Sequence, residues 1–130
     1  ANEMNIGGVI YGTGLYGTGK IGINTGAAPN SSLQVTGSLA LSYVAKTANY
    51  TLTATDYAVN ATSNSFDITL PTAASITGRI YVIKNSGTGV ITVKTTSSQT
   101  IDGAASGTIT LNQYDPALSV MSDGSNWIKV

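Results

Sequence analysis

Ser65-Phe-Asp-Ile-Thr-Leu70 and Arg79-Ile-Tyr-Val-Ile-Lys84 decide the fold class of this chain of 130 residues. In the first stretch apolar and polar residues alternate, which is typical of a strand with one buried face. In the second stretch four apolar residues follow one another, which is typical of a strand covered on both faces. Both stretches therefore predict β-structure.

Strand patterns continue from these two stretches towards the C-terminus. Asn85 to Gly89 reads as a hairpin loop, and Asp123-Gly124 as a tight hairpin turn, since Gly and Asp accept the backbone angles that such turns need. The strands expected after the second stretch cover residues 90–94, 108–111, 117–121 and 126–130. Short strands at this spacing predict an antiparallel, jelly-roll-like β-sandwich as a head domain over residues 38–130.

The composition agrees with an all-β chain. By count there are 19 Thr residues but a single Glu, and charged residues make up 9% of the chain. β-Branched side chains suit pleated surfaces, whereas good helix formers for exposed positions are nearly missing. The net charge of zero and the scattered basic residues argue against nucleic-acid binding. No apolar run is long enough to predict membrane insertion.

Residues 1–37 differ from the rest, because they hold nine of the fifteen glycines. They include a repeat, Tyr11-Gly-Thr-Gly-Leu15 followed by Tyr16-Gly-Thr-Gly-Lys20. One copy of such a segment buries too little surface to offset its ordering cost. It is either a flexible linker or an extended β-ribbon that intertwines with other copies. The recurring apolar residues favour the ribbon, with an interface made by Ile10, Leu15, Ile21 and Ile23.

Two nucleotide-binding patterns occur in the same segment. Gly12 to Gly17 has the dinucleotide spacing, and Gly14 to Lys20 has the phosphate-loop spacing. Both mechanisms need a helix directly afterwards, whose amides hold the phosphate. Ile21-Gly22-Ile23-Asn24 follows instead and is strand-like, so a structural repeat is the preferred interpretation.

The residue types also argue against catalysis. The chain has no His and no Cys, which removes the most common general base and the thiol nucleophile. No two of the six carboxylates share a local context that would predict a glycosidase pair. We therefore expect no enzyme, no metal site and no cofactor, with a carboxylate pair formed between subunits as the open alternative.

Two aromatic positions could bind a ligand. Trp127 lies on the last expected strand, where packing in the core or between subunits is the preferred interpretation. Asn112, Gln113, Tyr114 and Asp115 precede Pro116 and group polar side chains with an aromatic ring. Aromatic and amide groups on loops commonly contact sugars. This segment is the candidate receptor-binding loop, and an ordinary turn is its alternative.

Several short motifs in order resemble the C-terminal region of bacteriophage tail-fibre and tailspike proteins. Gly22-Ile-Asn-Thr25 and Ser32-Leu-Gln-Val-Thr-Gly37 resemble an element that recurs in these fibres. The other motifs are Ala48 to Tyr57, Leu70-Pro-Thr-Ala73, Gly78 to Asn85, Ile101-Asp-Gly103 and Ser122 to Trp127.

The resemblance implies an elongated homotrimer on the virion, associated with other virion proteins. Its C-terminal β-domain would cap the fibre and contact a polysaccharide or protein of the bacterial surface. Tail fibre, head fibre and baseplate appendage are all compatible with these motifs. A purely structural trimerisation cap and a glycan depolymerase with a site between subunits are the competing functions.

Overall fold

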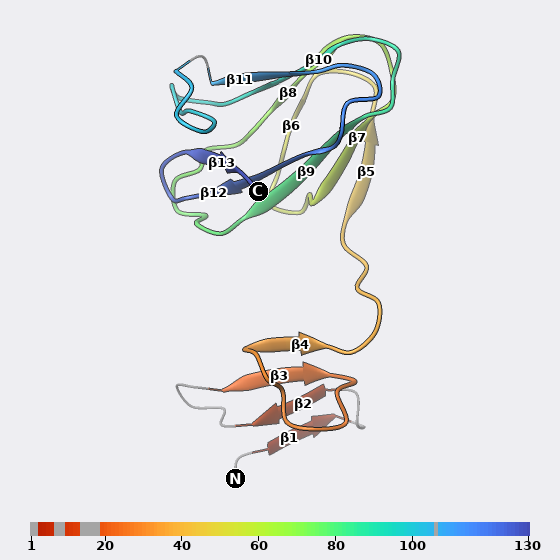
Figure 1. Cartoon of the computed structure of the whole chain (residues 1–130), viewed down its shortest axis with the longest axis vertical. Coiled ribbons are helices and arrows are strands. Elements are labelled where there is room, and N and C mark those ends of the chain that lie inside the picture. Colours follow the sequence, from red (N-terminus) through yellow and green to blue (C-terminus); the bar gives the residue numbers. More distant parts are fainter. Residues whose placement is uncertain (1–2, 7–9, 14–18, 106) are drawn as a thin grey trace. The chain divides into compact units, whose positions relative to one another are not determined.

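The chain is described by a computed structural model and divides into two compact units, Ala1–Ala40 and Leu41–Val130. The division lies close to the boundary expected after residue 37. The structure describes the backbone of residues 3–6, 10–13, 19–105 and 107–130, and the side chains of residues 19–105 and 107–130. Every regular element in this described part is a β-strand (Figure 1). The described residues include no helix capable of crossing a membrane.

The N-terminal unit is a four-stranded sheet in the order β1-β2-β3-β4. Its strands are β1 (Glu3–Ile6), β2 (Ile10–Thr13), β3 (Lys20–Ile23) and β4 (Leu33–Val35). The first three pair antiparallel, and β3 pairs parallel with β4. These strands thus pair within one chain, whereas the ribbon expected from the sequence also winds round other copies. That intertwining stays a prediction.

One face of β3 requires glycine. Gly22 is buried, and a Cβ atom there would lie 2.6 Å from Thr25 Oγ1 and 2.8 Å from Pro29 Cγ. The loop that carries these two residues therefore closes directly over the strand. The register pairs Ile21 with Leu33, and both side chains are exposed. The opposite face of β3 and β4 is thus apolar and uncovered.

In the C-terminal unit, here called the head, the described residues 41–105 and 107–130 form nine strands in two sheets. One sheet has the order β11-β10-β8-β6 and the other β13-β12-β9-β7-β5. The strands are β5 (Tyr43–Lys46), β6 (Tyr50–Thr51), β7 (Ala58–Ala61), β8 (Phe66–Thr69), β9 (Ile80–Asn85), β10 (Ile91–Lys94), β11 (Thr108–Leu111), β12 (Leu118–Ser122) and β13 (Trp127–Lys129).

From β5 to β10 the chain alternates between the two sheets. Strands two apart in sequence are therefore neighbours and run parallel, as in β5–β7, β7–β9, β6–β8 and β8–β10. Parallel neighbours need a crossover connection, and here a strand of the other sheet supplies it. Antiparallel pairing begins only at β11, in the pairs β10–β11, β9–β12 and β12–β13.

This connectivity corrects two predictions. The expected hairpin through Asn85 to Gly89 is wrong, because β9 and β10 lie in different sheets. The antiparallel pairing expected throughout the head holds only for the pairs that involve β11, β12 and β13, and the other pairs are parallel. By contrast, the hairpin at Asp123-Gly124 is confirmed by the antiparallel pair β12–β13.

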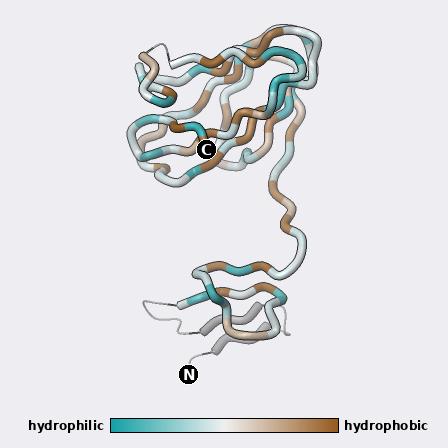
Figure 2. Tube along the Cα trace, viewed as in Figure 1, coloured by the Kyte–Doolittle hydropathy of each residue, from teal (hydrophilic) through white to brown (hydrophobic). Residues whose placement is uncertain are grey.

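The two head sheets share one hydrophobic core. Ile68, Ile91 and Val93 come from one sheet and Val59, Tyr81, Ile83, Val120 and Trp127 from the other, and all are almost fully buried. The apolar segments of the head lie along these strands (Figure 2). Trp127 packs against Tyr81 with ring centroids 5.6 Å apart. Trp127 therefore belongs to the core of the head and is not exposed to stack on a ligand.

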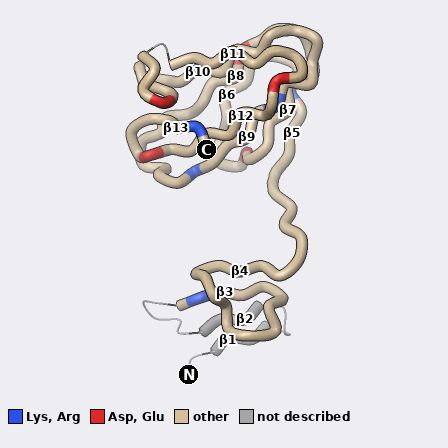
Figure 3. Tube along the Cα trace, in the orientation of Figure 1, with Lys and Arg blue, Asp and Glu red and all other residues tan. Residues whose placement is uncertain are grey.

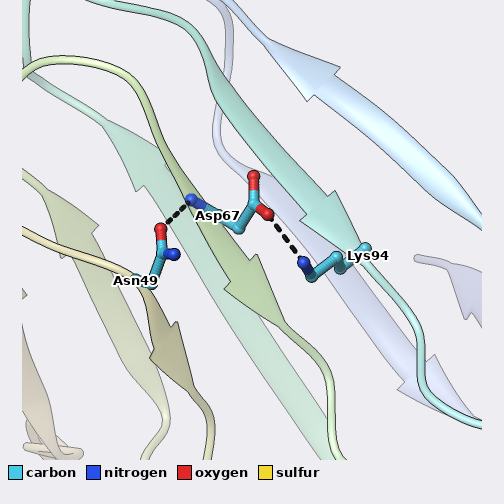
Figure 4. Close-up of polar contacts among 3 residues, drawn as sticks. All are labelled: Asn49, Asp67 and Lys94. Atoms are coloured by element: carbon cyan, nitrogen blue, oxygen red, sulfur yellow. Dashed lines mark hydrogen bonds and ion pairs between the residues drawn. The ribbon is translucent and has the colours of Figure 1, made fainter.

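Charged residues in the head are few and separated (Figure 3). Lys94 Nζ lies 2.6 Å from Asp67 Oδ2, and the main-chain amide of Asp67 donates to Asn49 Oδ1 at 2.9 Å (Figure 4). A second ion pair joins Lys129 Nζ to Asp102 Oδ2 at 3.0 Å. Because both pairs are half exposed, water and salt screen them and they contribute little to stability.

Asp56 holds the turn between β6 and β7. Its Oδ2 atom accepts hydrogen bonds from the main-chain amide of Thr53 at 2.7 Å, the Thr53 hydroxyl at 2.9 Å and the Tyr50 hydroxyl at 2.9 Å. Burial has the largest single effect on the pKa of Asp56 and raises it. The hydrogen bonds from Thr53 and Tyr50 act in the opposite direction and together outweigh burial, so the pKa is lowered.

A lowered folded-state pKa makes this turn sensitive to acid. Asp56 stabilises the fold above its unfolded-state pKa, near the ordinary value of 3.8, and the contribution is lost as pH falls through the folded-state pKa. We expect Asp56→Asn to cost about 1–3 kcal/mol at neutral pH, since it weakens bonds to a charged acceptor. The difference in free energy of unfolding between the wild type and Asp56→Asn should disappear as pH falls below 4. Denaturant titrations across the acid range measure this difference. A constant difference would contradict this role.

Candidate functional site

Four loops meet at one end of the head. The strands β5, β7 and β9 are parallel and end together, and β11 ends beside them. The loops that follow these strands cover residues 47–49, 62–65, 86–90 and 112–117, and they are called the distal loops below. The chain enters β5 at the opposite end of the head (Figure 1). The distal loops therefore lie far from the point where the N-terminal unit is joined.

Two of the distal loops pack backbone against backbone. Gly87 is buried, and a Cβ atom there would overlap the main-chain carbonyl of Ser63. A Cβ atom at Gly89 would collide with the main-chain amide of Ser65. The Val90 amide donates to the Ser65 hydroxyl at 2.9 Å. Glycine is required at both positions because any larger residue would force the loops apart.

Asn85 ties a third distal loop to this pair. Its side chain is buried, and Nδ2 donates to the carbonyls of Gly89 at 2.8 Å and Leu111 at 2.9 Å. Its Oδ1 accepts from the Gly87 amide at 3.0 Å. One amide thus fixes the loop after β9 and the end of β11 together. The ammonium group of Lys84 also donates to the carbonyl of Asp115.

The candidate receptor-binding residues form a locked turn among the distal loops. Asp115 Oδ2 accepts hydrogen bonds from the Asn112 amide at 2.7 Å and from Asn112 Nδ2 at 3.1 Å. The Asp115 amide donates to the carbonyl of Asn112 at 3.2 Å. Asn112 and Asp115 therefore hold the turn, as their residue types commonly do. Tyr114 and Gln113 lie between them.

Tyr114 is presented outward by this turn. Its exposed fraction is 86%, the highest among the large apolar residues described as exposed. Its φ of 76° lies in the left-handed region, which a tyrosine rarely adopts. Strained backbone of this kind persists only where the surrounding structure holds it, and it is often found at functional positions. Tyr114 is thus a strongly exposed side chain in the turn that the sequence predicts as a contact loop.

The head carboxylates are engaged in internal hydrogen bonds or ion pairs, namely Asp56, Asp67, Asp102, Asp115 and Asp123. No pocket is found in the described part of the chain. Tyr114, the amide of Gln113 and the hydroxyl and amide groups of the neighbouring loops offer a contact surface, with Lys84 and Asp115 as the charged residues beside it.

The candidate interface residues lie in the N-terminal unit. Ile10 is placed in β2, opposite Ile23 of β3 in the register. Ile21 is exposed and Ile23 is half-buried. Leu15 lies outside the described residues. The structure thus places Ile21 and Ile23 on the uncovered face of this sheet.

Sequence reasoning missed Asn85 and the way in which the distal loops meet. The sequence predicts the segment Asn85-Ser-Gly-Thr-Gly89 only as a hairpin loop. Its asparagine could have indicated a capping amide, because asparagine often bonds to nearby backbone. Nothing local in the sequence indicates that the carbonyl of Leu111 is its partner.

We compared the chain with protein-family models, curated proteins and solved structures, and none of them matches it.

Proposed function

We propose that this chain is the non-catalytic tip of a bacteriophage fibre, a homotrimer on the virion that attaches to a glycan or protein of the bacterial surface. In this proposal the head is a two-sheet β-sandwich, and the Gly-rich segment of residues 1–37 intertwines between copies. The observation that carries it is Tyr114, exposed on a locked turn at the end of the head opposite the point where the chain enters.

The geometry of the head fits an attachment role. The distal loops are held rigidly by glycine packing and by Asn85, so a partner would lose little of its binding energy to ordering them. A contact built on one tyrosine and its polar neighbours is weak. Three copies in one assembly would raise the overall affinity through avidity. The sequence motifs that resemble phage fibres support the same proposal.

A purely structural role is the second candidate. It is favoured by the internal bonding of Asn112 and Asp115, because Asn112 Nδ2 and Asp115 Oδ2 bond to each other and hold the turn. In this case the head would act as a cap on the fibre without a receptor.

Replacing Tyr114 by glycine should separate stability from attachment. Glycine adopts the left-handed region without strain, so the free energy of unfolding should stay level or rise by up to about 1 kcal/mol. Loss of an exposed aromatic anchor should weaken binding by about tenfold or more. The measurements are denaturant unfolding and binding of fluorescently labelled protein to a panel of bacterial cells and isolated surface polysaccharides.

Thr108→Gly serves as the control, because Thr108 is exposed at the start of β11, at the end of that strand away from the distal loops. It should lower stability slightly and leave binding unchanged. If wild-type protein binds no cell or polysaccharide in the panel, the structural cap is the better description. Equal binding by the wild type and Tyr114→Gly would contradict the role of Tyr114 as a binding residue.

A further inference from the structure

The two head sheets have outer faces of opposite character. In the sheet of β6, β8, β10 and β11 the register aligns Thr51, Thr69, Lys94 and Thr108 in one row, and Asp67, Thr92 and Thr110 in the next. This outer face is entirely polar and carries the Asp67–Lys94 ion pair (Figure 4). It has the composition expected of a sheet face in contact with water.

The outer face of the other sheet is mainly apolar. The register aligns Tyr43, Ala58, Val82 and Ser119 in one row, and Ile80, Met121 and Ile128 in another. A third row contains Ala45, Asn60 and Lys84. Tyr43 is 65% exposed and Val130, which follows β13, is 61% exposed.

The polar members of this face are partly engaged within the head. Lys84 is the one charged residue that the register places on this face in the described strands. Its ammonium group donates a hydrogen bond to the carbonyl of Asp115. Asn60 Nδ2 donates to the Tyr43 hydroxyl at 3.2 Å. The face therefore offers no charge pattern that would select a strongly charged partner.

The sequence of β9 indicates that this face is covered. Four consecutive apolar residues, Ile80 to Ile83, are typical of a strand buried on both sides. Tyr81 and Ile83 are buried in the core, whereas Ile80 and Val82 point to the outer face and are only half-buried. A single chain thus covers only the inner face of β9 and leaves its outer face partly exposed.

A second copy of the chain fits this surface better than a charged partner does. The net charge is zero, so copies approach one another without long-range repulsion, a condition that favours association. Within the head, Leu41 also lies shortly before β5 and is exposed. Every copy brings the same apolar face to an assembly.

We infer that the outer face of β5, β7, β9, β12 and β13 is the surface through which copies of this chain associate. This self-association face deepens the proposed function, on which it rests for the number of copies. It leaves the polar outer face of the other sheet and the turn of Tyr114 free in the assembly.

Cysteine labelling of the full chain tests the self-association face without changing its packing. The chain has no cysteine of its own, so each introduced thiol reports one position. Ser119→Cys lies on the self-association face, and Thr92→Cys lies on the polar face as its matched control; both positions are half-buried in one chain. With a maleimide reagent we expect Ser119→Cys to react at least about tenfold more slowly than Thr92→Cys in the assembled protein.

Sedimentation of the same samples identifies what covers the thiol. Protection in an oligomer that disappears on dilution to monomer supports the proposal. Protection that persists in a monomer would mean that the chain's own N-terminal unit covers this face, and the proposal would be overturned. Equal labelling of the two thiols in an oligomer would also overturn it.

A charge-introducing variant provides the second test. Tyr43→Glu combined with Ile128→Glu alters two exposed side chains, so the head should stay folded, as far-UV circular dichroism would report. We expect the association constant to fall about a hundredfold, whereas Thr51→Glu combined with Thr110→Glu should leave it unchanged. An intact oligomer in the first variant would place the contacts elsewhere in the chain.

The two proposals fail in distinguishable ways. A wild-type chain that is monomeric at every concentration contradicts both of them. A wild-type oligomer that Tyr43→Glu and Ile128→Glu do not weaken contradicts the self-association face alone. An oligomer that these substitutions weaken, but that binds no cell or polysaccharide, contradicts attachment alone.

Discussion

Replacing Trp127 by alanine should lower the free energy of unfolding by about 3–5 kcal/mol, because it removes the largest buried side chain of the head. The indole ring is fully buried and packs on Tyr81, so its loss leaves a cavity between the two sheets. Since a domain of this size is stable by only about 5–15 kcal/mol, the loss is a large fraction of the total stability. Denaturant titration at one fixed protein concentration measures the effect.

Trp127→Phe separates the effect of the apolar contact from that of the indole N–H group. The indole Nε1 is buried and has no hydrogen-bond partner among the described residues. Phenylalanine keeps most of the apolar contact and removes this unpaired donor, whose burial costs about 1–3 kcal/mol. We expect Trp127→Phe to cost much less than Trp127→Ala. Equal losses would show that Nε1 finds a partner in the assembled protein.

Asn85→Ala should have the second large effect, at about 3 kcal/mol or more, because it removes three hydrogen bonds that this buried side chain makes with backbone groups of the distal loops. These groups are the carbonyls of Gly89 and Leu111 and the amide of Gly87. The loss should also loosen the turn of Tyr114, which follows Leu111 directly. Hydrogen exchange of the Gly87 amide, together with denaturant unfolding, measures both consequences.

Asn85→Asp tests the same contact through its pH dependence. A carboxylate has the shape of the amide but faces two carbonyls to which it cannot donate, so burial should raise its pKa above the unfolded-state value. The penalty is then present at neutral pH and is relieved as pH falls through the raised folded-state pKa. We expect the stability gap to wild type to narrow in acid.

Asn64→Asp is the matched control for this pH dependence. Asn64 is exposed, and its Oδ1 only accepts a hydrogen bond, from the amide of Ser65 at 2.8 Å. A carboxylate accepts the same bond, so no comparable narrowing should occur. If the stability difference to wild type narrowed in acid for both variants, burial at position 85 would not be its cause.

The strands of the C-terminal half could be predicted closely because their local patterns are strong. Residues 65–70, 79–84 and 108–111 were expected as strands, and they correspond to β8, β9 and β11. The strands β5, β6 and β7 were not predicted. They are short, and β7 reads Ala58-Val-Asn-Ala61, in which small residues carry the buried positions and weaken the alternation.

The candidate site could be predicted only in outline. Asn112 to Asp115 was selected because its residue types suit a contact loop, and the structure does bring these residues together in one turn. Within this turn Asn112 and Asp115 hold the backbone, whereas Tyr114 is exposed. These different roles depend on backbone angles and hydrogen bonds. Those are set by packing against Asn85 and Lys84, which are distant in the sequence.

The amino-acid sequence by itself determined that this chain is built of β-strands, where most of the later strands lie, and that a Gly-rich segment precedes a head. Period-two patterning and β-branched composition are local properties, which each segment carries alone. Only the tertiary structure decided that successive strands alternate between two sheets, so that the apparent hairpin after β9 crosses the core. It also decided that one outer face is polar and the other apolar. Burial of apolar surface is non-directional, so a pattern shows which residues share a face but not which segment covers it.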